Sequence, residues 1–98
     1  MTDITDFAMR EDGQRRRYFL SMPNGEEARL TLVKTSATHW IADHTFVPVP
    51  YRGRDIAERL VDRLIADARK EGAKITATCW YVADAFKQHA PDWDDVRA

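Results

Sequence analysis

A strand-like segment, a short basic turn and an amphipathic helix follow one another directly between residues 44 and 68. Within the helix the apolar residues recur at helical spacing; they are Ile56, Ala57, Leu60, Val61, Leu64, Ile65 and Ala68. Gly72, placed after Arg69 and Lys70, is typical of a helix C-terminus. Because a strand-like segment comes next, we expect the strands on either side of this helix to be parallel and joined by a right-handed βαβ crossover.

The other segments predict a hairpin before this unit and a second helix after it. The strand-like segments are rich in apolar or aromatic residues; they are residues 15–22, 26–34, 39–47 and 74–78. Pro23-Asn24-Gly25 supplies turn chemistry between the first two, and Pro48 and Pro50 end the third. Residues 81–89 predict the second helix. The order βββαβα indicates an α+β fold with a mixed four-stranded sheet and two helices.

Length and composition limit the possible classes of protein. A chain of 98 residues predicts a single domain over 1–98, and residues 1–14, which show no sustained period, predict a loose N-terminal arm. Apolar residues at 44% and charged residues at 32% are ordinary for a globular chain. A net charge of −1 argues against a general nucleic-acid binder. With no membrane-length apolar run and no signal-peptide pattern, we expect a cytoplasmic protein that does not bind a membrane.

Cysteine, histidine and aromatic residues add three expectations. Cys79 is the only cysteine, so an internal disulfide is excluded, and no Cys/His cluster predicts a metal site. Trp40, Phe86 and Trp93 are expected in the core.

The run of three arginines at 15–17 has two interpretations, a phosphate or nucleic-acid patch and a solvated strand start. Successive residues on a strand face opposite ways, so the three cations are not expected to meet on one ligand. We therefore expect the solvated strand start.

The basic turn at residues 51–54 is the strongest candidate for a binding site. A turn that opens a helix directs unpaired backbone N–H groups, at the positive end of the helix dipole, into one small volume that suits a phosphate or another anion. Ligands of open sheets lie beyond the carboxyl ends of parallel strands. The two parallel strands are expected to end at Val47 and Thr78, so the turn and residues 79–81 should border one cleft.

Four short motifs in this half of the chain resemble the GCN5-related N-acetyltransferases (GNAT family), in particular a short single-domain subfamily. They are HTFVP at 44–48, YRGRDIA at 51–57, CWYV at 79–82 and QHAP at 88–91. The resemblance implies a truncated GNAT-like fold that binds acetyl-coenzyme A or coenzyme A and transfers the acyl group to an amine of a small molecule or a protein. It implies that the pyrophosphate lies on backbone amides of the loop and the acyl arm between two splayed strands. The implied cofactor-binding residues are Val47, Arg52, Gly53, Arg54, Asp55, Ile56 and Ala57.

Three residues are candidates for the chemistry that the resemblance implies. His44 is the best available base, Tyr81 the best acid, and Cys79 a nucleophile or a contact to the thiol. Each also has a structural alternative: a hydrogen-bonded strand histidine, a packing tyrosine and a small buried cysteine.

Departures from the family pattern support a second hypothesis. Asp55 stands where the family has glycine, and it adds a Cβ and a negative charge beside an anionic ligand. As an N-cap its carboxylate is expected to bind the N2 and N3 amides and to stabilise the helix. Phe46 replaces the family's usual glutamate and Trp80 its small residue or proline. The alternative is a non-catalytic module that holds coenzyme A weakly, binds another anion or contacts a protein partner.

Overall fold

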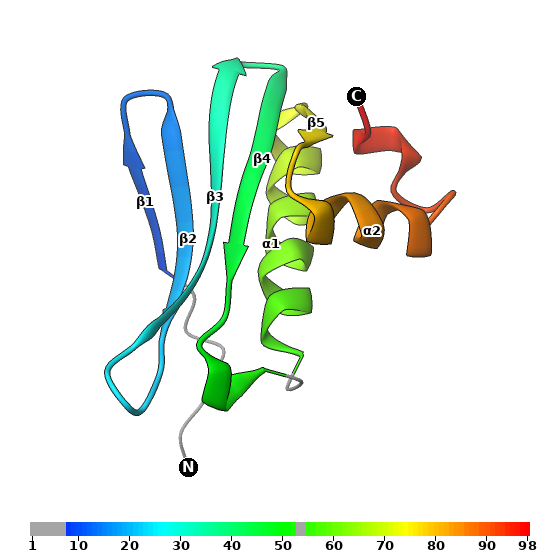
Figure 1. The fold of residues 1–98 in the computed structure, drawn as a ribbon. Coiled ribbons are helices and arrows are strands. Elements are labelled where there is room, and N and C mark those ends of the chain that lie inside the picture. Colours follow the sequence, from blue (N-terminus) through cyan, green and yellow to red (C-terminus); the bar gives the residue numbers. More distant parts are fainter. Residues whose placement is uncertain (1–7, 53–54) are drawn as a thin grey trace.

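The computed structural model describes residues 8–52 and 55–98, which form a five-stranded sheet with helices packed on it (Figure 1). The strands are β1 Ala8–Asp12, β2 Arg15–Ser21, β3 Glu27–Ser36, β4 His39–Phe46 and β5 Lys74–Ala77. The helices are α1 Ile56–Glu71 and α2 Trp80–Gln88, with short 3-10 helices η1 Val49–Tyr51 and η2 Asp94–Val96. Neighbouring strands are antiparallel from β1 to β4, whereas β4 and β5 are parallel. The α+β class and the parallel pair across α1 are confirmed.

The sheet has one strand more than the sequence predicted. Residues 8–12, expected to belong to a loose arm, pair with β2 as an edge strand in which Met9 lies opposite Tyr18. Every residue of β1 is exposed, so this strand has no buried face and no apolar alternation that a sequence pattern could reveal. The prediction of four strands was therefore wrong by one, and residues 1–7 of the expected arm lie outside the described residues.

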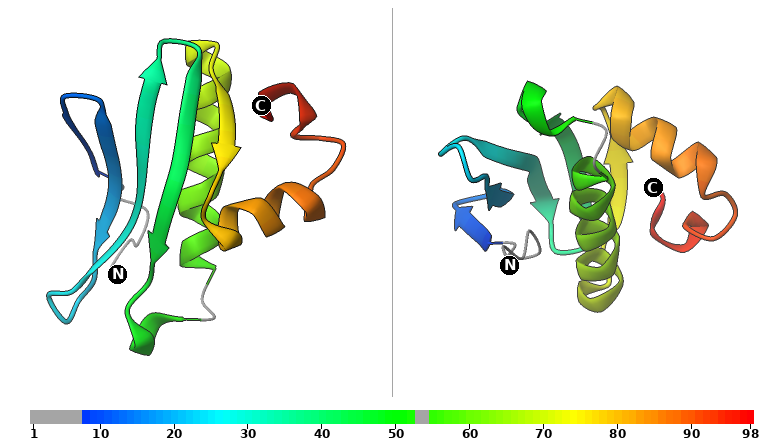
Figure 2. Two further views of the ribbon diagram at one scale, coloured as in Figure 1. Left: turned by 45° about the horizontal axis from the view of Figure 1, so that its top comes forward. Right: turned by 90° about the horizontal axis from the view of Figure 1, so that it is seen from below.

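Helix α1 covers one face of the sheet, the face turned away from the viewer in Figure 1; the two views of Figure 2 show the same layering. Its buried residues are Ile56, Leu60, Val61, Leu64, Ile65 and Ala68. Each fully buried leucine or isoleucine contributes about 2 kcal/mol of transfer free energy. The helix ends as predicted, because Gly72 adopts φ 72° and donates its N–H to the carbonyl of Ala68.

A buried arginine connects β2 to α1. Arg16 is only 3% exposed, and its Nη1 lies 2.8 Å from a carboxylate oxygen of Glu71. Tyr18 Oη accepts a hydrogen bond from Arg16 and donates one to Asp67 over 2.8 Å. The expectation of a solvated strand start was wrong for Arg16, because the alternation that separates it from Arg15 and Arg17 directs it under the helix.

The C-terminal segment, from α2 to η2, completes the core by packing against α1, β4 and β5. Phe86 of α2 and Trp93 are buried and meet edge to face, with ring centroids 5.7 Å apart. Trp40 is fully buried, so the three aromatic residues expected in the core are confirmed. No helix in residues 8–52 and 55–98 is long and apolar enough to cross a membrane.

Candidate functional site

The two parallel strands separate at their carboxyl ends. The ladder between β4 and β5 stops at Ala42 and Ala77, and the N–H groups of Thr78 and Cys79 both donate to the Ala42 carbonyl, at 3.0 and 3.1 Å. Beyond that point β4 continues beside β3 alone, as far as Phe46. The first turns of α1 and α2 flank the gap that results (Figure 2).

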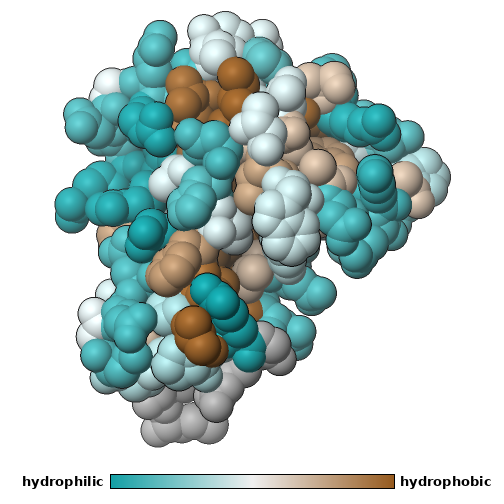
Figure 3. Space-filling view, viewed as in Figure 1, coloured by the Kyte–Doolittle hydropathy of each residue, from teal (hydrophilic) through white to brown (hydrophobic). Residues whose placement is uncertain are grey.

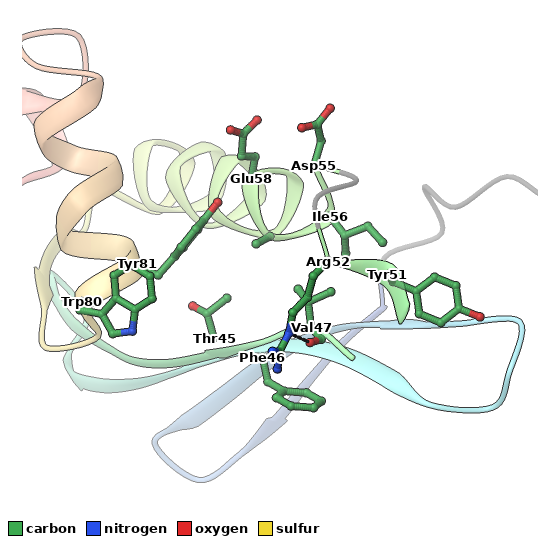
Figure 4. A pocket seen from close by; sticks show the side chains of 11 residues that line it. Thr45, Phe46, Val47, Tyr51, Arg52, Asp55, Ile56, Glu58, Trp80 and Tyr81 are labelled. Atoms are coloured by element: carbon green, nitrogen blue, oxygen red, sulfur yellow. Dashed lines mark hydrogen bonds between the residues drawn. The ribbon is translucent and has the colours of Figure 1, made fainter. Parts of the chain in front are cut away.

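A pocket of about 570 Å³ occupies this position, a volume typical of sites for small molecules and cofactors. Its walls come from the end of β4, the following 3-10 turn and the first turns of both helices (Figure 4). The lining residues are Thr45, Phe46, Val47, Tyr51, Arg52, Asp55, Ile56, Ala57, Glu58, Trp80 and Tyr81. The cleft expected between the basic turn and residues 79–81 is therefore present.

Most of the candidate residues meet at this pocket. Those that line it are Val47, Arg52, Asp55, Ile56, Ala57 and Tyr81. Gly53 and Arg54, the centre of the predicted loop, lie outside the described residues. Cys79 lies just behind the wall, where its half-buried thiol is 3.6 Å from the hydroxyl of Thr45.

His44 does not line the pocket. It is exposed and pairs with Thr31, whereas Ala42 pairs with Leu32, so Asp43 is an extra residue in β4. This β-bulge reverses the alternation of side chains, and Thr45 rather than His44 faces the pocket. His44 consequently lies on the sheet face that α1 does not cover.

Asp55 has a backbone conformation that favours glycine. Its φ of 62° and ψ of 12° are left-handed, and its side chain makes no capping hydrogen bond, although its carbonyl accepts the N–H of Arg59 at 3.0 Å. Capping carboxylates normally extend from a residue with β-region dihedrals. The expectation that Asp55 occupies the N2 and N3 amides was therefore wrong, and its carboxylate leaves these donors to another acceptor.

The charges around the pocket are mixed. Arg52 donates from Nε to the carbonyl of Val47 at 2.9 Å and holds its guanidinium 5.9 Å from the ring centroid of Phe46. Asp55 and Glu58 place two carboxylates at the same rim, beside the N-terminus of α1 (Figure 4). Among the described lining residues, carboxylates therefore outnumber the single arginine.

Tyr81 is the lining residue best suited to hold a proton. Burial raises the pKa of its phenol, and the negative charges of Glu58 and Asp55 raise this pKa further. Its hydroxyl is therefore protonated at neutral pH. Trp80 beside it is 78% exposed and contacts it edge to face, with centroids 5.8 Å apart.

Two lining residues were not predicted from the sequence, Thr45 and Glu58, whereas Tyr51 belongs to the predicted turn. Glu58 had a usable signal, since it lies in the first turn of the helix whose N-terminus was the predicted binding site. Thr45 was not predictable because the bulge at Asp43 changes which residues of β4 face the pocket. In residues 8–52 and 55–98, no group of three or more His, Cys, Asp or Glu could hold a metal ion.

Solved structures that share this fold include the following two. A GCN5-like protein from Staphylococcus aureus, solved by NMR, aligns with a TM-score of 0.66 over 100% of this chain and 91% of its own, at 18% identity. A Klebsiella pneumoniae protein assigned to the acyl-CoA N-acyltransferases aligns with a TM-score of 0.61 over 80% of this chain and 57% of its own, at 17% identity.

Other relatives are more similar to this chain in sequence than these two solved structures are. Protein NATD1 of Homo sapiens is 36% identical over 81 residues, which are 81% of this chain and 72% of that protein. Protein NATD1 of Danio rerio is 32% identical over 89 residues, 89% of this chain and 81% of that protein. Residues 17–96 match the family described as GCN5-related N-acetyl-transferase, so this chain belongs to the GCN5-related N-acetyltransferase family.

Proposed function

We propose that the chain is an acetyl-coenzyme A-dependent N-acetyltransferase that acylates an amine. The observation that carries this proposal is the pocket at the opening between β4 and β5. There, α1 begins beside the gap between the two separated parallel strands. Family membership supports the reaction class, and the volume and position of the pocket support binding of an acyl donor there.

The residues of the pocket fit an acyl donor that carries a pyrophosphate. The backbone amides of Ile56 and Ala57 lie at the positive end of α1 and are not capped by the Asp55 side chain. Arg52 adds a cation to the pocket lining on the strand side, near Phe46, and Val47 adds an apolar wall. Gly53 and Arg54 belong to the proposed loop through the family motif. The carboxylates of Asp55 and Glu58 oppose this binding and are expected to weaken it without blocking the amides.

Acyl transfer requires an acid for the departing thiolate and a base for the amine. As the amine nitrogen bonds to the thioester carbon and the carbon–sulfur bond breaks, the protonated phenol of Tyr81 supplies the proton that the thiolate takes up. Cys79 and Thr45 lie together beside this position and fix the end of β5. His44, the expected base, lies on the other face of the sheet, so it can serve only an amine that reaches the thioester through the opening between β4 and β5.

An acetylation assay with a panel of amines tests this proposal. Acetylated products are counted by mass spectrometry, because a thiol dye would also label Cys79. We expect Tyr81→Phe to lower kcat by roughly a hundredfold or more while the Kd for acetyl-coenzyme A changes less than about threefold. Cys79→Ala is the matched control for packing in this region. A loss of turnover in this variant would indicate that the thiol takes part in the chemistry, whereas unchanged turnover would indicate that Cys79 has only a structural role. Equal turnover by Tyr81→Phe and the parent would exclude Tyr81 as the acid.

One observation favours a second candidate, a non-catalytic module of the same fold. Asp55 and Glu58 make the pocket rim acidic where an anionic donor would bind. Binding of coenzyme A at the pocket without turnover of any amine tested would support this candidate.

A further inference from the structure

We propose that the sheet face not covered by α1 is a docking surface for an acidic polypeptide segment. The surface, here the basic patch, combines arginines, one histidine and two aromatic rings from four strands; it consists of Arg10, Arg17, Phe19, Arg29, His44 and Phe46. This proposal goes beyond the proposed acetyl transfer and does not depend on it.

Strand register brings these residues into two adjacent rows across the sheet. One row runs from Arg10 through Arg17 and Thr31 to His44, because each of these residues lies opposite the next on neighbouring strands. The row beside it contains Phe19, Arg29 and Phe46, paired in the same way. Residues paired across antiparallel strands point to the same face, so the patch is continuous.

The position of α1 leaves this face uncovered within the described residues. The helix packs on the opposite face, where its Asp67 and Glu71 reach Tyr18 and Arg16. Figure 3 shows the uncovered face in the orientation of Figure 1, with hydrophilic side chains over most of the strands and apolar groups between them. Arg10 and His44 are exposed there, whereas Arg17 and Arg29 are half-buried.

The two phenylalanine rings hold the arginines in place. The guanidinium carbons of Arg17 and Arg10 lie 5.1 and 5.9 Å from the centroid of Phe19. The guanidinium carbon of Arg29 lies 4.8 Å from the centroid of Phe46. A guanidinium that stacks on a ring can still present N–H groups at its edge to a carboxylate, and less side-chain entropy is then lost on binding. The patch is thus preorganised for carboxylates.

Charge distinguishes the patch from the rest of the chain. The patch itself contains three arginines and no acid, in a chain whose whole sequence carries a net charge of −1. Two acids border the patch on the same face: Glu27 lies 3.6 Å from Arg17, and Asp43 accepts a hydrogen bond from Thr31 and pairs with Arg15. A carboxylate of the partner can replace the contact that Glu27 makes with Arg17. Complementary charge steers a partner to such a surface and fixes its register.

A short acidic segment fits these observations better than a single-stranded nucleic acid. Base stacking needs open aromatic faces, and here arginines already lie over both Phe19 and Phe46. A chain of net charge −1 also lacks the general basic excess of nucleic-acid binders. In an extended peptide, alternate side chains point to the same side. A peptide with a carboxylate on alternate residues can therefore direct its charges to a patch that spans a few strands.

A titration with a short peptide of alternating glutamate and serine, followed by backbone amide shifts of the full chain, tests the proposal. We expect saturable shifts in β2, β3 and β4 around Arg17 and Arg29, and binding that weakens as salt is raised. The double variant Arg17→Gln with Arg29→Gln should bind the peptide roughly tenfold more weakly. Arg59→Gln with Lys70→Gln, which removes the same charge from exposed positions of α1, should change affinity less than about twofold.

Several results would overturn the proposal. They are equal binding of a peptide with glutamine in place of glutamate, shifts confined to other elements, equal affinity of the two double variants, and tighter binding of single-stranded oligouridylate than of the acidic peptide. If the Arg17 and Arg29 variant does not fold, the location of the shifts in the unaltered chain still decides the question.

Discussion

Substitutions of Asp55 test two effects separately: the effect of its left-handed backbone on stability, and the effect of its charge on binding at the pocket. At φ 62° a residue with a Cβ carries about 1 to 2 kcal/mol of strain that glycine does not. Glycine in turn loses about 0.4 to 1 kcal/mol more conformational free energy on folding. We therefore expect Asp55→Gly to be more stable than Asp55→Ala by about 1 kcal/mol, which corresponds to about 4–8 °C in Tm for a domain of this size. Both variants lose the carboxylate, so the charge cancels in this comparison.

Asparagine at the same position isolates the charge. Asp55→Asn keeps a side chain that tolerates the left-handed region and removes only the negative charge. At roughly 5 Å in water, one carboxylate and two pyrophosphate charges repel by about 1.5 kcal/mol in total. Isothermal titration at low salt is therefore expected to show Asp55→Asn binding acetyl-coenzyme A about tenfold more tightly than the parent. The gain should shrink as the salt concentration rises.

Two results would refute this reasoning. If Asp55→Ala and Asp55→Gly unfold at the same temperature, the left-handed conformation does not matter to stability. If Asp55→Asn binds no more tightly than the parent, the carboxylate does not face the ligand, and the proposed position of the pyrophosphate is wrong.

Three further predictions concern the core beneath the sheet. Burial raises the pKa of Tyr18, so its neutral form stabilises the fold below a pH of about 10 and this contribution is lost as pH rises further; Tyr18→Phe should flatten the alkaline loss of stability in urea denaturation. The indole N–H of Trp40 is buried and has no hydrogen-bond partner among the residues that the structure describes. Trp40→Phe should therefore lower the free energy of unfolding by less than about 2 kcal/mol, against the 3–5 kcal/mol usual for deleting a buried tryptophan side chain. Glu71→Gln weakens the main ion pair of buried Arg16 and should lower stability by about 1–3 kcal/mol, measured by thermal unfolding; an unchanged Tm would show that Arg16 needs no charged partner from α1.

Local sequence patterns predicted the elements that bury one face. The apolar stripe and Gly72 predicted the bounds of α1, and the apolar content of residues 26–34 predicted β3. The fully exposed β1 carries no such pattern, since only backbone pairing with β2 defines it. An edge strand without a buried face cannot be predicted from hydrophobic periodicity.

The sequence predicted which segments meet at the site, but not how individual side chains and backbone groups are oriented there. The turn, the helix N-terminus and Tyr81 were placed together by strand order alone. The bulge at Asp43 and the left-handed backbone of Asp55 were not predicted, because each depends on neighbouring strands and loops. The basic patch was missed for the same reason: alternation correctly separated Arg16 from its two neighbours, but the arginines that join Arg17 lie on other strands.

A titration of acetyl-coenzyme A into the unaltered chain, followed by backbone amide shifts, tests most directly whether the pocket between β4, α1 and α2 binds the acyl donor. We predict saturable shifts at Asp55, Ile56 and Ala57 with an affinity in the micromolar range, together with shifts at Thr45 and Tyr81. Amides at these positions that do not respond to millimolar acetyl-coenzyme A would contradict the proposed function.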